Sequence, residues 1–487
     1  MGVRSFNLRM IAALNGTLLL IVAAMMLLSA SVALLYGEAA GPLCLSSGFT
    51  AVVGLFLRLA QKGAKSDEVR RRDGFLIVAS GWIFMSLFGC LPYLFSGAIP
   101  DFVDAWFETM SGFTTTGATI LTDIEALPYN LLFWRSMTHW IGGMGIIVLT
   151  IAILPLLGVG GMQLFVAEAP GVTPDKLHPR ITGTAKRLWL IYFSLTVAES
   201  LLLRLAGMGW FDSVNHAMAT MATGGFSTKN ASLAHFSTPA IHYVVMVFMF
   251  LAGINFTLLY FGFTGKLSRL FRNEEFKVYA LNTLLFGLGV ALILFVFNFY
   301  PWEEALRNGF FTVISITTTT GFVTEDYLQW PNFLVFVVFV LFFSGGSTGS
   351  TAGGIKIMRH IVLIKNSGTE LRRQLHPNAI LPVRFNGKAV PQNITNTISG
   401  FVLIWLIVFF IGSFVMSMQG LDFQSAVGSV TATLGNIGPG LGQVGPVENF
   451  AHIPVTGKFF LSLLMLMGRL ELFTILVLFM PHFWRND

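Results

Sequence analysis

The chain has 487 residues, of which 54% are hydrophobic and only 11% are charged, and its mean hydropathy is +0.72. Because soluble domains carry about 25% charged residues, this composition excludes an ordinary water-soluble protein and predicts a chain that lies in a lipid bilayer. The net charge of +6 comes from basic runs that flank apolar segments and lack interleaved aromatic side chains, which argues against a nucleic-acid partner. Two cysteines, Cys44 and Cys90, are too few for a disulfide framework.

Long apolar runs predict about ten membrane spans, since one span needs roughly 20 residues. The first run, from Ile11 to Tyr36, is too long for the apolar part of a cleavable signal peptide, so we interpret it as the first membrane helix. The expected spans cover residues 10–36, 41–59, 75–97, 130–156, 186–207, 238–263, 278–300, 331–364 (interrupted), 394–418 and 456–480.

Four segments between these spans are too short to cross a bilayer. We expect short helices at about residues 102–114, 211–222, 304–317 and 422–433. Each is followed by a Thr- or Gly-rich stretch and then by another span. A short helix that is flanked by true spans on both sides is typical of a re-entrant element.

The four Thr- or Gly-rich stretches form a degenerate internal repeat. They end at Gly117, Gly225, Gly321 and Gly438, which lie 108, 96 and 117 residues apart. This recurrence predicts four copies of one membrane unit. Four such loops around one axis offer a dehydrated cation main-chain carbonyls in place of its water shell, so the repeat predicts an ion-selective pore. One stretch alone indicates no more than a polar break in a helix.

The last three residues of each stretch are the predicted potassium-filter residues. Glycine turns carbonyls inward because it reaches positive φ without a Cβ clash, and threonine hydroxyls supply further oxygens. In the fourth stretch we choose Gly438 over Gly435, because every short helix then has a small residue six positions before the glycine. These small residues are Ser111, Ala219, Ser315 and Ala432. The predicted filter consists of Thr115, Thr116, Gly117, Thr223, Gly224, Gly225, Thr319, Thr320, Gly321, Asn436, Ile437 and Gly438.

The charged residues predict the orientation of the chain. Of the 30 Lys and Arg residues, 24 fall in segments that share one side under this assignment of spans. The positive-inside rule places that side, with both termini, in the cytoplasm, and the four stretches then open to the outside. Carboxylates near the stretches predict a mouth that attracts cations, although outer loops depleted in Lys and Arg give the same pattern. They are Asp101, Asp104, Glu108, Asp123, Glu125, Asp212, Glu303, Glu304, Glu325, Asp326, Asp422 and Glu448.

A run of small residues from Gly345 to Gly354 interrupts the span expected at residues 331–364. Irregular backbone at membrane depth is tolerated only where it is buried in protein or lines an aqueous cavity, so we interpret the run as a gate below the filter. A flexible linker is the alternative, and a phosphate-binding loop is excluded because the run lacks the Gly-Lys-Ser/Thr ending. The predicted gate residues are Gly345, Gly346, Ser347, Thr348, Gly349, Ser350, Thr351 and, from the last span, Arg469.

Arg469 lies near the centre of the last expected span, where a charged side chain costs at least ~2.5–3.5 kcal/mol. Glu471 is two residues away on another face of the helix and is therefore a poor partner. We expect Arg469 to face the pore, where its charge opposes the passage of cations. The alternative is an ion pair with another helix, for example through Glu199.

Together these elements predict an all-α polytopic membrane protein. It has two N-terminal helices and four helix–pore-helix–loop–helix repeats with pseudo-fourfold symmetry around one pore. The expected divisions are residues 1–73 for the two-helix preface, 74–157 and 158–265 for the first two repeats, 266–390 for the third repeat with its gating loop, and 391–487 for the fourth.

On the four filter glycines, the interrupted span and Arg469, the chain resembles the Trk/Ktr/HKT superfamily of potassium transporters over essentially its full length. The two N-terminal helices resemble TrkH-type rather than KtrB-type members. The resemblance implies potassium as the transported ion, with potassium selectivity where all four filter positions are glycine. It also implies a homodimer in the bacterial inner membrane, with one pore per protomer, on a cytoplasmic TrkA-like ring that binds nucleotides.

The basic segments Lys266 to Lys277 and Lys356 to Lys388 are long enough to dock such a partner, with ordinary membrane anchoring as the alternative. No nucleotide site is expected in the chain itself, because the sequence from Gly158 to Gly161 lacks the spacing of a dinucleotide-binding fingerprint. Nucleotide control therefore requires a partner.

An enzyme and a coupled symporter are the two alternatives to a channel. No enzyme is indicated, because the nine histidines are scattered without metal-ligand spacing. A proton- or sodium-coupled potassium symporter needs ionisable groups at the membrane midplane and alternating access. Four units in one orientation, with Glu199 and Glu471 as the few expected buried carboxylates, favour a channel-like route.

Overall fold

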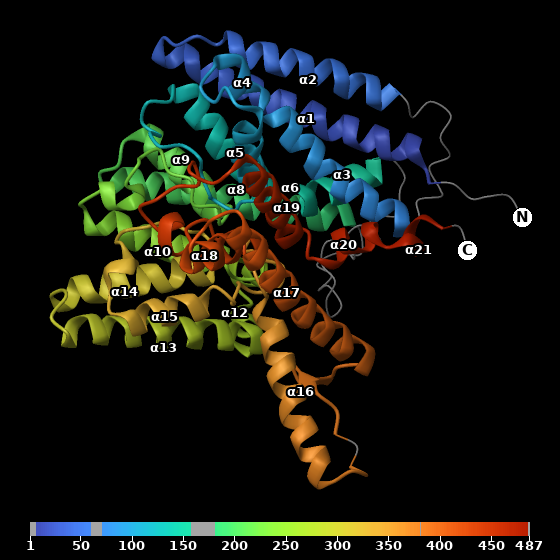
Figure 1. Cartoon of the computed structure of the whole chain (residues 1–487), viewed down its shortest axis with the longest axis vertical. Coiled ribbons are helices and arrows are strands. Elements are labelled where there is room, and N and C mark those ends of the chain that lie inside the picture. The colour runs from blue at the N-terminus through green and yellow to red at the C-terminus, as the bar shows by residue number, and fades with distance from the viewer. Residues whose placement is uncertain (1–5, 60–70, 157–180, 380, 486–487) are drawn as a thin grey trace, which may run out of the picture.

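The computed structural model describes residues 6–59, 71–156, 181–379 and 381–485, without the side chains of residues 71, 144, 146–156 and 181–185. The Gly158–Gly161 segment and the predicted boundary at residues 157/158 lie outside this part. The regular secondary structure of the described chain is helical except for one short hairpin of two strands, and the helices are joined by loops (Figure 1). The prediction of an all-α polytopic protein is thus confirmed.

Two N-terminal helices lie side by side at one edge of the molecule (Figure 1). They are α1 (Leu8–Tyr36) and α2 (Gly41–Leu59). They cross at Gly16 and Gly54, where a Cβ on Gly16 would lie 2.5 Å from the Gly54 carbonyl oxygen. This close approach of two backbones depends on the absence of side chains.

Four units follow, and each contains a helix, a short helix, an extended stretch and a further helix. Unit 1 has α3 (Arg71–Gly89), α4 (Leu91–Ser96), α5 (Phe102–Phe113) and α6 (Tyr129–Leu156). Unit 2 has α8 (Ile181–Leu205), α9 (Trp210–Met221), η1 (Ser232–His235), α10 (Pro239–Ala252), α11 (Phe256–Phe263) and α12 (Leu267–Arg272). Unit 3 has α13 (Glu274–Val296), α14 (Trp302–Thr317), η2 (Tyr327–Gln329), α15 (Asn332–Leu341) and α16 (Ile357–Leu375).

Unit 4 begins after a hairpin formed by β1 (Arg384–Phe385) and β2 (Lys388–Ala389), which pair antiparallel. Its elements are α17 (Gln392–Met418), α18 (Phe423–Leu434), η3 (Gly442–Val444), α19 (Val455–Arg469), α20 (Phe473–Leu476), η4 (Val477–Phe479) and α21 (Pro481–Trp484). Helices α16 and α17 form an arm that projects from the rest of the molecule (Figure 1).

The short helices α5, α9, α14 and α18 agree with the four predicted ones to within two residues at each end. Three have 12 residues and α14 has 16. At about 1.5 Å of rise per residue none of them crosses a hydrocarbon layer of about 30 Å. The side chain of Asp101 caps α5 by accepting the Val103 N–H (2.8 Å), and Asp422 caps α18 by accepting the Ser425 N–H (3.3 Å).

Two expected spans are broken, so the prediction of continuous helices at residues 238–263 and 456–480 was wrong. The chain bends by 109° between α10 and α11, where Asn255 starts a new helix by accepting the Thr257 N–H (2.8 Å). It bends by 113° after α19, where Glu471 adopts a φ of 55°. Arg469 consequently lies in the last turn of α19 at a break, not near the centre of a continuous span.

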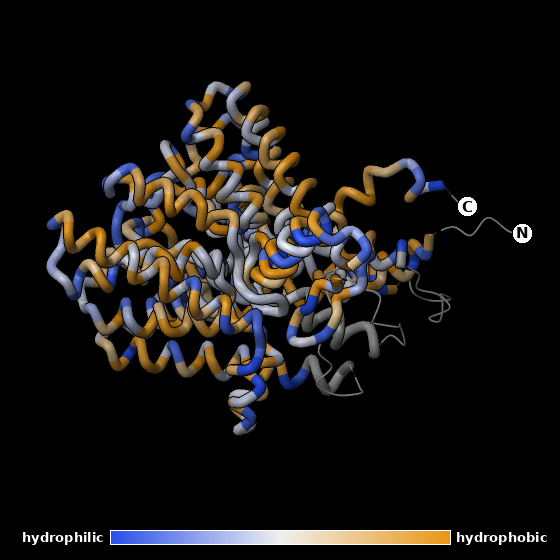
Figure 2. The backbone as a smooth tube through the Cα atoms, turned by 90° about the horizontal axis from the view of Figure 1, so that it is seen from below, coloured by the Kyte–Doolittle hydropathy of each residue, from blue (hydrophilic) through white to orange (hydrophobic). Residues whose placement is uncertain are grey.

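Within the described residues, six helices are long and apolar enough to cross a membrane, and the two bent pairs raise this number to eight if each pair is one span. Hydrophobic residues dominate the outer helices, whereas segments of more polar residues, drawn paler, lie toward the middle of the molecule (Figure 2). This distribution is the one expected when lipid surrounds the helices and the polar stretches are enclosed by protein.

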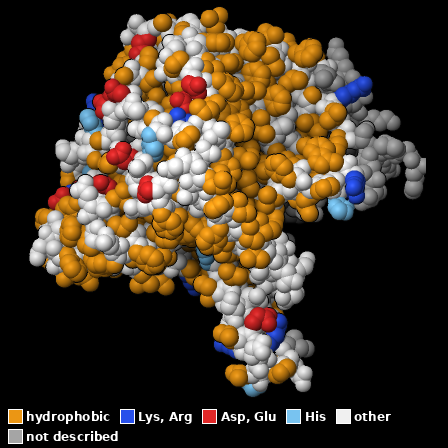
Figure 3. All heavy atoms as spheres, in the orientation of Figure 1, with side chains coloured by type: hydrophobic (Ala, Val, Ile, Leu, Met, Phe, Trp, Pro, Cys, Tyr) orange, Lys and Arg blue, Asp and Glu red, His pale blue; other side chains and the backbone are white. Residues whose placement is uncertain are grey.

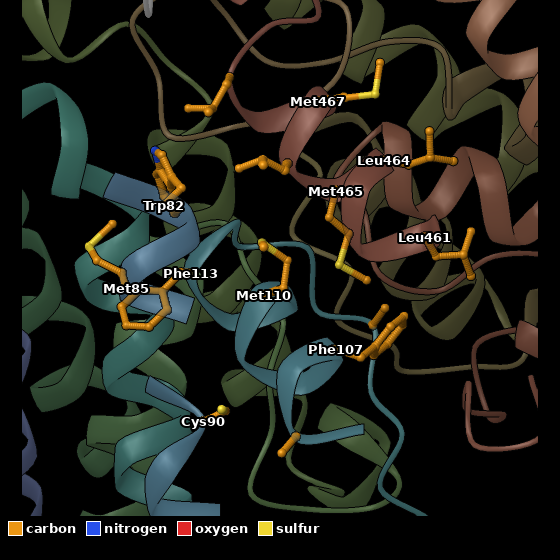
Figure 4. Packing of buried hydrophobic residues seen from close by; sticks show 14 of the residues in the cluster. Trp82, Met85, Cys90, Phe107, Met110, Phe113, Leu461, Leu464, Met465 and Met467 are labelled. Carbon is orange, nitrogen blue, oxygen red and sulfur yellow. The ribbon is translucent and has the colours of Figure 1, made fainter. Parts of the chain in front are cut away.

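Unit 4 packs against unit 1, so the units close on themselves. In Figure 4, Phe107 of α5 lies close to Leu461 and Met465 of α19, whereas Trp82 and Met85 of α3 lie on the other side of α5. All five side chains are at most 1% exposed. The remaining neighbours follow chain order, with α6 against α9 and α10 against α14. The four short helices therefore surround a common centre.

Candidate ion pore and gate

The four Thr- or Gly-rich stretches share one backbone conformation. Each has a non-glycine residue in the left-handed region and, two residues later, a glycine with positive φ. The non-glycine residues are Thr115 (φ 51°), Thr223 (53°), Thr319 (55°) and Asn436 (52°). The glycines are Gly117 (φ 85°), Gly225 (78°), Gly321 (78°) and Gly438 (98°). In the fourth stretch Gly438, not Gly435, thus occupies the position of the other three glycines.

This conformation ends each short helix by satisfying its last carbonyls. In unit 1 the Thr115 N–H donates to Gly112 O (3.0 Å) and the Thr116 N–H donates to Ser111 O (2.9 Å), and equivalent bonds recur in the other units. The pattern is a Schellman motif, which usually has glycine in the left-handed position. A β-branched residue rarely adopts this conformation, so the backbone is strained at the same point in three of the four stretches.

The stretches touch one another in chain order and close into a ring. A Cβ added at each glycine would collide with a carbonyl oxygen of the next unit. The distances would be 2.1 Å from Gly117 to Gly224 O, 2.0 Å from Gly225 to Thr320 O, 1.9 Å from Gly321 to Ile437 O and 2.7 Å from Gly438 back to Thr116 O. Among the described residues, these four carbonyl oxygens accept no hydrogen bond.

A cavity of about 70 Å³ lies against one side of this ring. All four glycines line it, together with Arg135 of α6 and with residues of the loops that follow the stretches, among them Lys229 and Glu448. The ring is therefore reached from the side on which those loops lie.

A buried ion pair fixes the loops beside the ring. Arg135 of α6 and Glu108 of α5 are 2% and 1% exposed, and Arg135 Nε lies 2.7 Å from Glu108 Oε1. The Arg135 guanidinium also donates to Ser227 O (2.9 Å) and lies 3.5 Å from the ring centroid of Phe226. The prediction that Glu108 belongs to an acidic mouth was wrong, because this carboxylate is enclosed in protein.

His139 of α6 explains why the second stretch has glycine at a position where the others have Thr or Ile. Its ring stacks on Phe226 with 3.9 Å between centroids, and the Phe226 N–H donates to His139 Nδ1 (3.4 Å). A Cβ on Gly224 would lie 2.3 Å from the same nitrogen. Sequence analysis missed this contact, because the two residues are far apart in the chain.

The run that interrupts unit 3 is a packed loop and not a free linker. The Ser347 N–H donates to Gly253 O (2.9 Å), and Asn255 Nδ2 donates to Thr348 O (2.6 Å). The Thr351 hydroxyl donates to Met221 O (3.0 Å). Both broken ends of the α10–α11 span therefore hold the loop, and Ser347 and Thr351 are each 1% exposed.

The loop reaches the underside of the ring at Gly353. The Gly353 N–H donates to the Thr319 hydroxyl (2.6 Å). A Cβ on Gly353 would lie 2.7 Å from Gly435 O and 2.8 Å from Asn436 Cβ. Gly353 lies two residues beyond the predicted gate set, which ended at Thr351. Lys356, three residues further along the chain, donates to Ala352 O and is 9% exposed. A buried ammonium group therefore lies just beyond the contact between Gly353 and the ring.

Arg469 joins the loop to two helices. Its guanidinium donates to Thr351 O (2.7 Å), Gly142 O (2.9 Å) and Gly143 O (3.0 Å). The alternative ion pair with Glu199 is absent, because neither carboxylate oxygen of Glu199 has a hydrogen-bond partner among the described residues. Glu471 pairs with Arg359, not with Arg469.

More carboxylates are buried than the sequence predicts. Besides the expected Glu199 and Glu471, Glu108 and Glu275 are only 1% and 4% exposed. A carboxylate in the first turn of an apolar helix, as at Glu275, can indicate a buried carboxylate, but it does not reveal which residues the carboxylate contacts.

A ring of re-entrant loops enclosed by spanning helices, with a buried loop beneath it, defines a polytopic α-helical membrane transport protein. The TrkH family profile, described as cation transport protein, matches residues 49–486. The chain belongs to this family.

Several relatives match over almost the whole chain. The Trk system potassium uptake protein TrkH of Salmonella typhimurium is 42% identical over 486 residues, which cover 99% of this chain and 100% of that protein. TrkG of Escherichia coli is 36% identical and covers 86% of this chain, with 87% of its own length matched. The crystal structure of the potassium transporter TrkH from Vibrio parahaemolyticus superposes with a TM-score of 0.89 at 37% identity, covering 99% and 100% of the two chains.

Proposed function

We propose that the chain is the potassium-translocating membrane subunit of a Trk-type uptake system, and that potassium passes through the ring as in a channel. The single observation that carries this proposal is the closed ring formed by Gly117, Gly225, Gly321 and Gly438 with the carbonyls of the neighbouring units. The names of the relatives, which are potassium uptake proteins, support the choice of ion.

The selectivity for potassium follows from four main-chain carbonyl oxygens that accept no hydrogen bond from the described residues. The carbonyls of Thr116, Gly224, Thr320 and Ile437 replace water around a dehydrated potassium ion. The C-termini of α5, α9, α14 and α18 lead directly into the ring, and each adds about half a negative charge near the ion. The four ring glycines, Gly117, Gly225, Gly321 and Gly438, are required because a Cβ at any of them would collide with a carbonyl oxygen of the neighbouring unit.

The loop from Gly345 to Gly354 and Arg469 form the gate in this proposal. The loop touches the filter through Gly353, and the Arg469 guanidinium holds the loop at Thr351 O. Two cationic side chains on this side of the ring, the partly buried Arg469 and the buried Lys356, oppose the entry of potassium. Conduction requires that the loop and both cations withdraw from the axis.

A proton-coupled potassium symporter is the second candidate. Glu199 favours it, because this carboxyl lies on the spanning helix α8, is 0% exposed and has no hydrogen-bond partner among the described residues. Buried ionisable groups in spanning helices are typical of proton relays.

The proposed location is the bacterial inner membrane, with both termini in the cytoplasm. On the face shown in Figure 3, acidic side chains gather mostly toward the left, whereas most Lys and Arg side chains lie near the termini and at the end of the α16 arm. This segregation supports the orientation given by the positive-inside rule. The homodimer and the TrkA-like nucleotide-binding ring are proposed from the family resemblance, and the boundaries of the repeats are proposed from the recurrence of the four stretches.

The proposal is tested with the purified full-length chain in liposomes. Potassium and sodium fluxes are measured with and without an imposed pH gradient. A channel gives a potassium-selective flux that follows the electrochemical gradient of potassium and ignores the pH gradient. Uphill potassium movement driven by the pH gradient, lost in Glu199→Gln, would establish the symporter instead.

A further inference from the structure

Two adjacent carboxylates at the start of α13 hold two different parts of the molecule. Glu275 is 4% exposed, and its Oε1 accepts the Thr348 N–H (2.7 Å) and the Met358 N–H (3.1 Å). Thr348 lies inside the gate loop and Met358 lies just after it. One oxygen of α13 therefore ties the loop to the helix that follows the loop.

Glu274 holds the β1–β2 hairpin in the same way. Its Oε2 accepts the Asn386 N–H (3.0 Å), while its own N–H donates to Asn386 Oδ1 (2.7 Å). Its Oε1 pairs with Lys365 of α16, whose ammonium also donates to Arg384 O (2.9 Å). Asn386 forms the turn of the hairpin with Gly387, and both have positive φ.

The two contacts share a rigid support. Asn273 caps α13 by accepting the Phe276 N–H (3.0 Å), so both carboxylates belong to one closed helical turn. The cap bond fixes this turn to the rest of α13, so Glu274 and Glu275 move together. A displacement that reaches Glu274 is therefore also a displacement of Glu275.

We propose that Glu275 is a positioning residue that keeps the gate loop closed, and that Glu274 couples it to the β1–β2 hairpin, so that displacing the hairpin releases the loop. This inference rests on the proposed function, because it assigns the means of regulation of the same gate. The hairpin residues Asn386, Gly387 and Lys388 are exposed, so the hairpin can be contacted from solvent.

The first arm of the test replaces the carboxylate. Glu275→Leu removes the acceptor of both N–H groups, and we expect potassium flux into liposomes to rise tenfold or more, which corresponds to about 1.4 kcal/mol in the closed–open equilibrium. Glu275→Gln is the matched control, because its carbonyl oxygen still accepts both bonds, and its flux stays near that of the unaltered chain. Glu275→Asp, whose shorter side chain withdraws the oxygen, provides a second variant if Glu275→Leu does not fold.

The second arm tests the coupling. We expect Asn386→Ala to raise the flux severalfold in the unaltered chain and to have no effect in the Glu275→Leu or Glu275→Asp background. Lys388→Ala, in the same hairpin, is the control and leaves the flux unchanged, because no hydrogen bond or ion pair joins Lys388 to α13 among the described residues. Independent, multiplying effects of the Asn386 and Glu275 substitutions would overturn the coupling, as would a Glu275→Leu or Glu275→Asp chain that stays closed.

Deletion of residues 347–352 separates this inference from the proposed function. If the deletion conducts potassium while the Glu275 variants stay closed, only the role of Glu275 is wrong. If neither the deletion nor any variant conducts potassium, the channel itself is wrong.

Discussion

The ring and the loop beneath it are both irregular backbone inside a membrane protein, but they are held in different ways. The ring is built four times from the same local hydrogen bonds, such as Thr116 N–H to Ser111 O, so its geometry follows from the ends of four helices. The loop is held by contacts that occur once, from Asn255, Glu275 and Arg469. A repeated local motif yields a fixed ring, whereas single long-range contacts allow the loop to move.

Magnitudes support this distinction. A hydrogen bond contributes about 0.5–1.5 kcal/mol net, and one to a charged group about 1.5–3 kcal/mol. The few bonds that hold the loop are therefore within the range that one binding event or one substitution overcomes. The stretches of neighbouring units touch backbone to backbone in the ring. A distortion of one stretch therefore forces its neighbours to move as well, and a local adjustment cannot absorb it.

The largest effect is expected from a side chain inside the ring. Gly117→Ser places a Cβ 2.1 Å from Gly224 O at a φ of 85°, so the ring must open locally. We expect the selectivity for potassium over sodium in liposome flux to fall by more than about tenfold. Gly97→Ser is the control, because Gly97 also has positive φ (71°) but has no atom within 4 Å of its Cβ position. Unchanged selectivity in Gly117→Ser would sink the assignment of the filter.

The second prediction concerns the support of the ring. Arg135→Ala leaves Glu108 as a buried, unpaired carboxylate, and breaking such a pair costs about 3–5 kcal/mol. Thermal unfolding of the detergent-solubilised protein should show a clear fall in Tm. Arg373→Ala removes a half-exposed ion pair with Glu370, and its loss should cost at most about 1 kcal/mol. Equal Tm values for the two variants would show that the buried pair does not stabilise the ring.

The third prediction addresses the loop. Arg469→Ala removes the bonds to Thr351 O, Gly142 O and Gly143 O, together with a positive charge below the ring. We expect potassium flux to rise roughly tenfold while selectivity stays unchanged, since the ring is not altered. Loss of folded protein, or a changed selectivity, would show that the gate and the ring are not separable.

The smallest effect is a pH dependence at the loops that follow the stretches. Burial raises the pKa of the Glu325 carboxyl, whereas the hydrogen bond from Asn230 lowers the pKa of Asp123. As the pH on the side of these loops falls, Glu325 takes up a proton before Asp123 does. Because Glu325 lines a small cavity with Gly321 and Ile437, we expect potassium flux to fall by less than about twofold. Glu325→Gln should abolish this dependence and Asp123→Asn should preserve it; the reverse pattern would contradict the assignment.

The sequence predicted the repeated parts of the molecule well and the unique contacts poorly. Periodic apolar runs and four glycines at similar spacing are local or repeated signals, so the short helices and the equivalence of Gly438 with the other glycines followed from them. The breaks at Asn255 and Glu471 were missed because apolar residues continue across them. Glu275 was missed, and Gly353 was left out of the named gate residues, because their roles depend on Thr348 and Thr319, which are distant in the chain.

Anomalous diffraction from crystals soaked in rubidium or thallium salts tests the central claim most directly. If potassium passes through the ring, an ion lies on the ring axis, surrounded by the carbonyl oxygens of Thr116, Gly224, Thr320 and Ile437, and this ion is absent from Gly117→Ser. Anomalous density elsewhere along the helices, with none on the ring axis of a protein that transports potassium, would contradict the account.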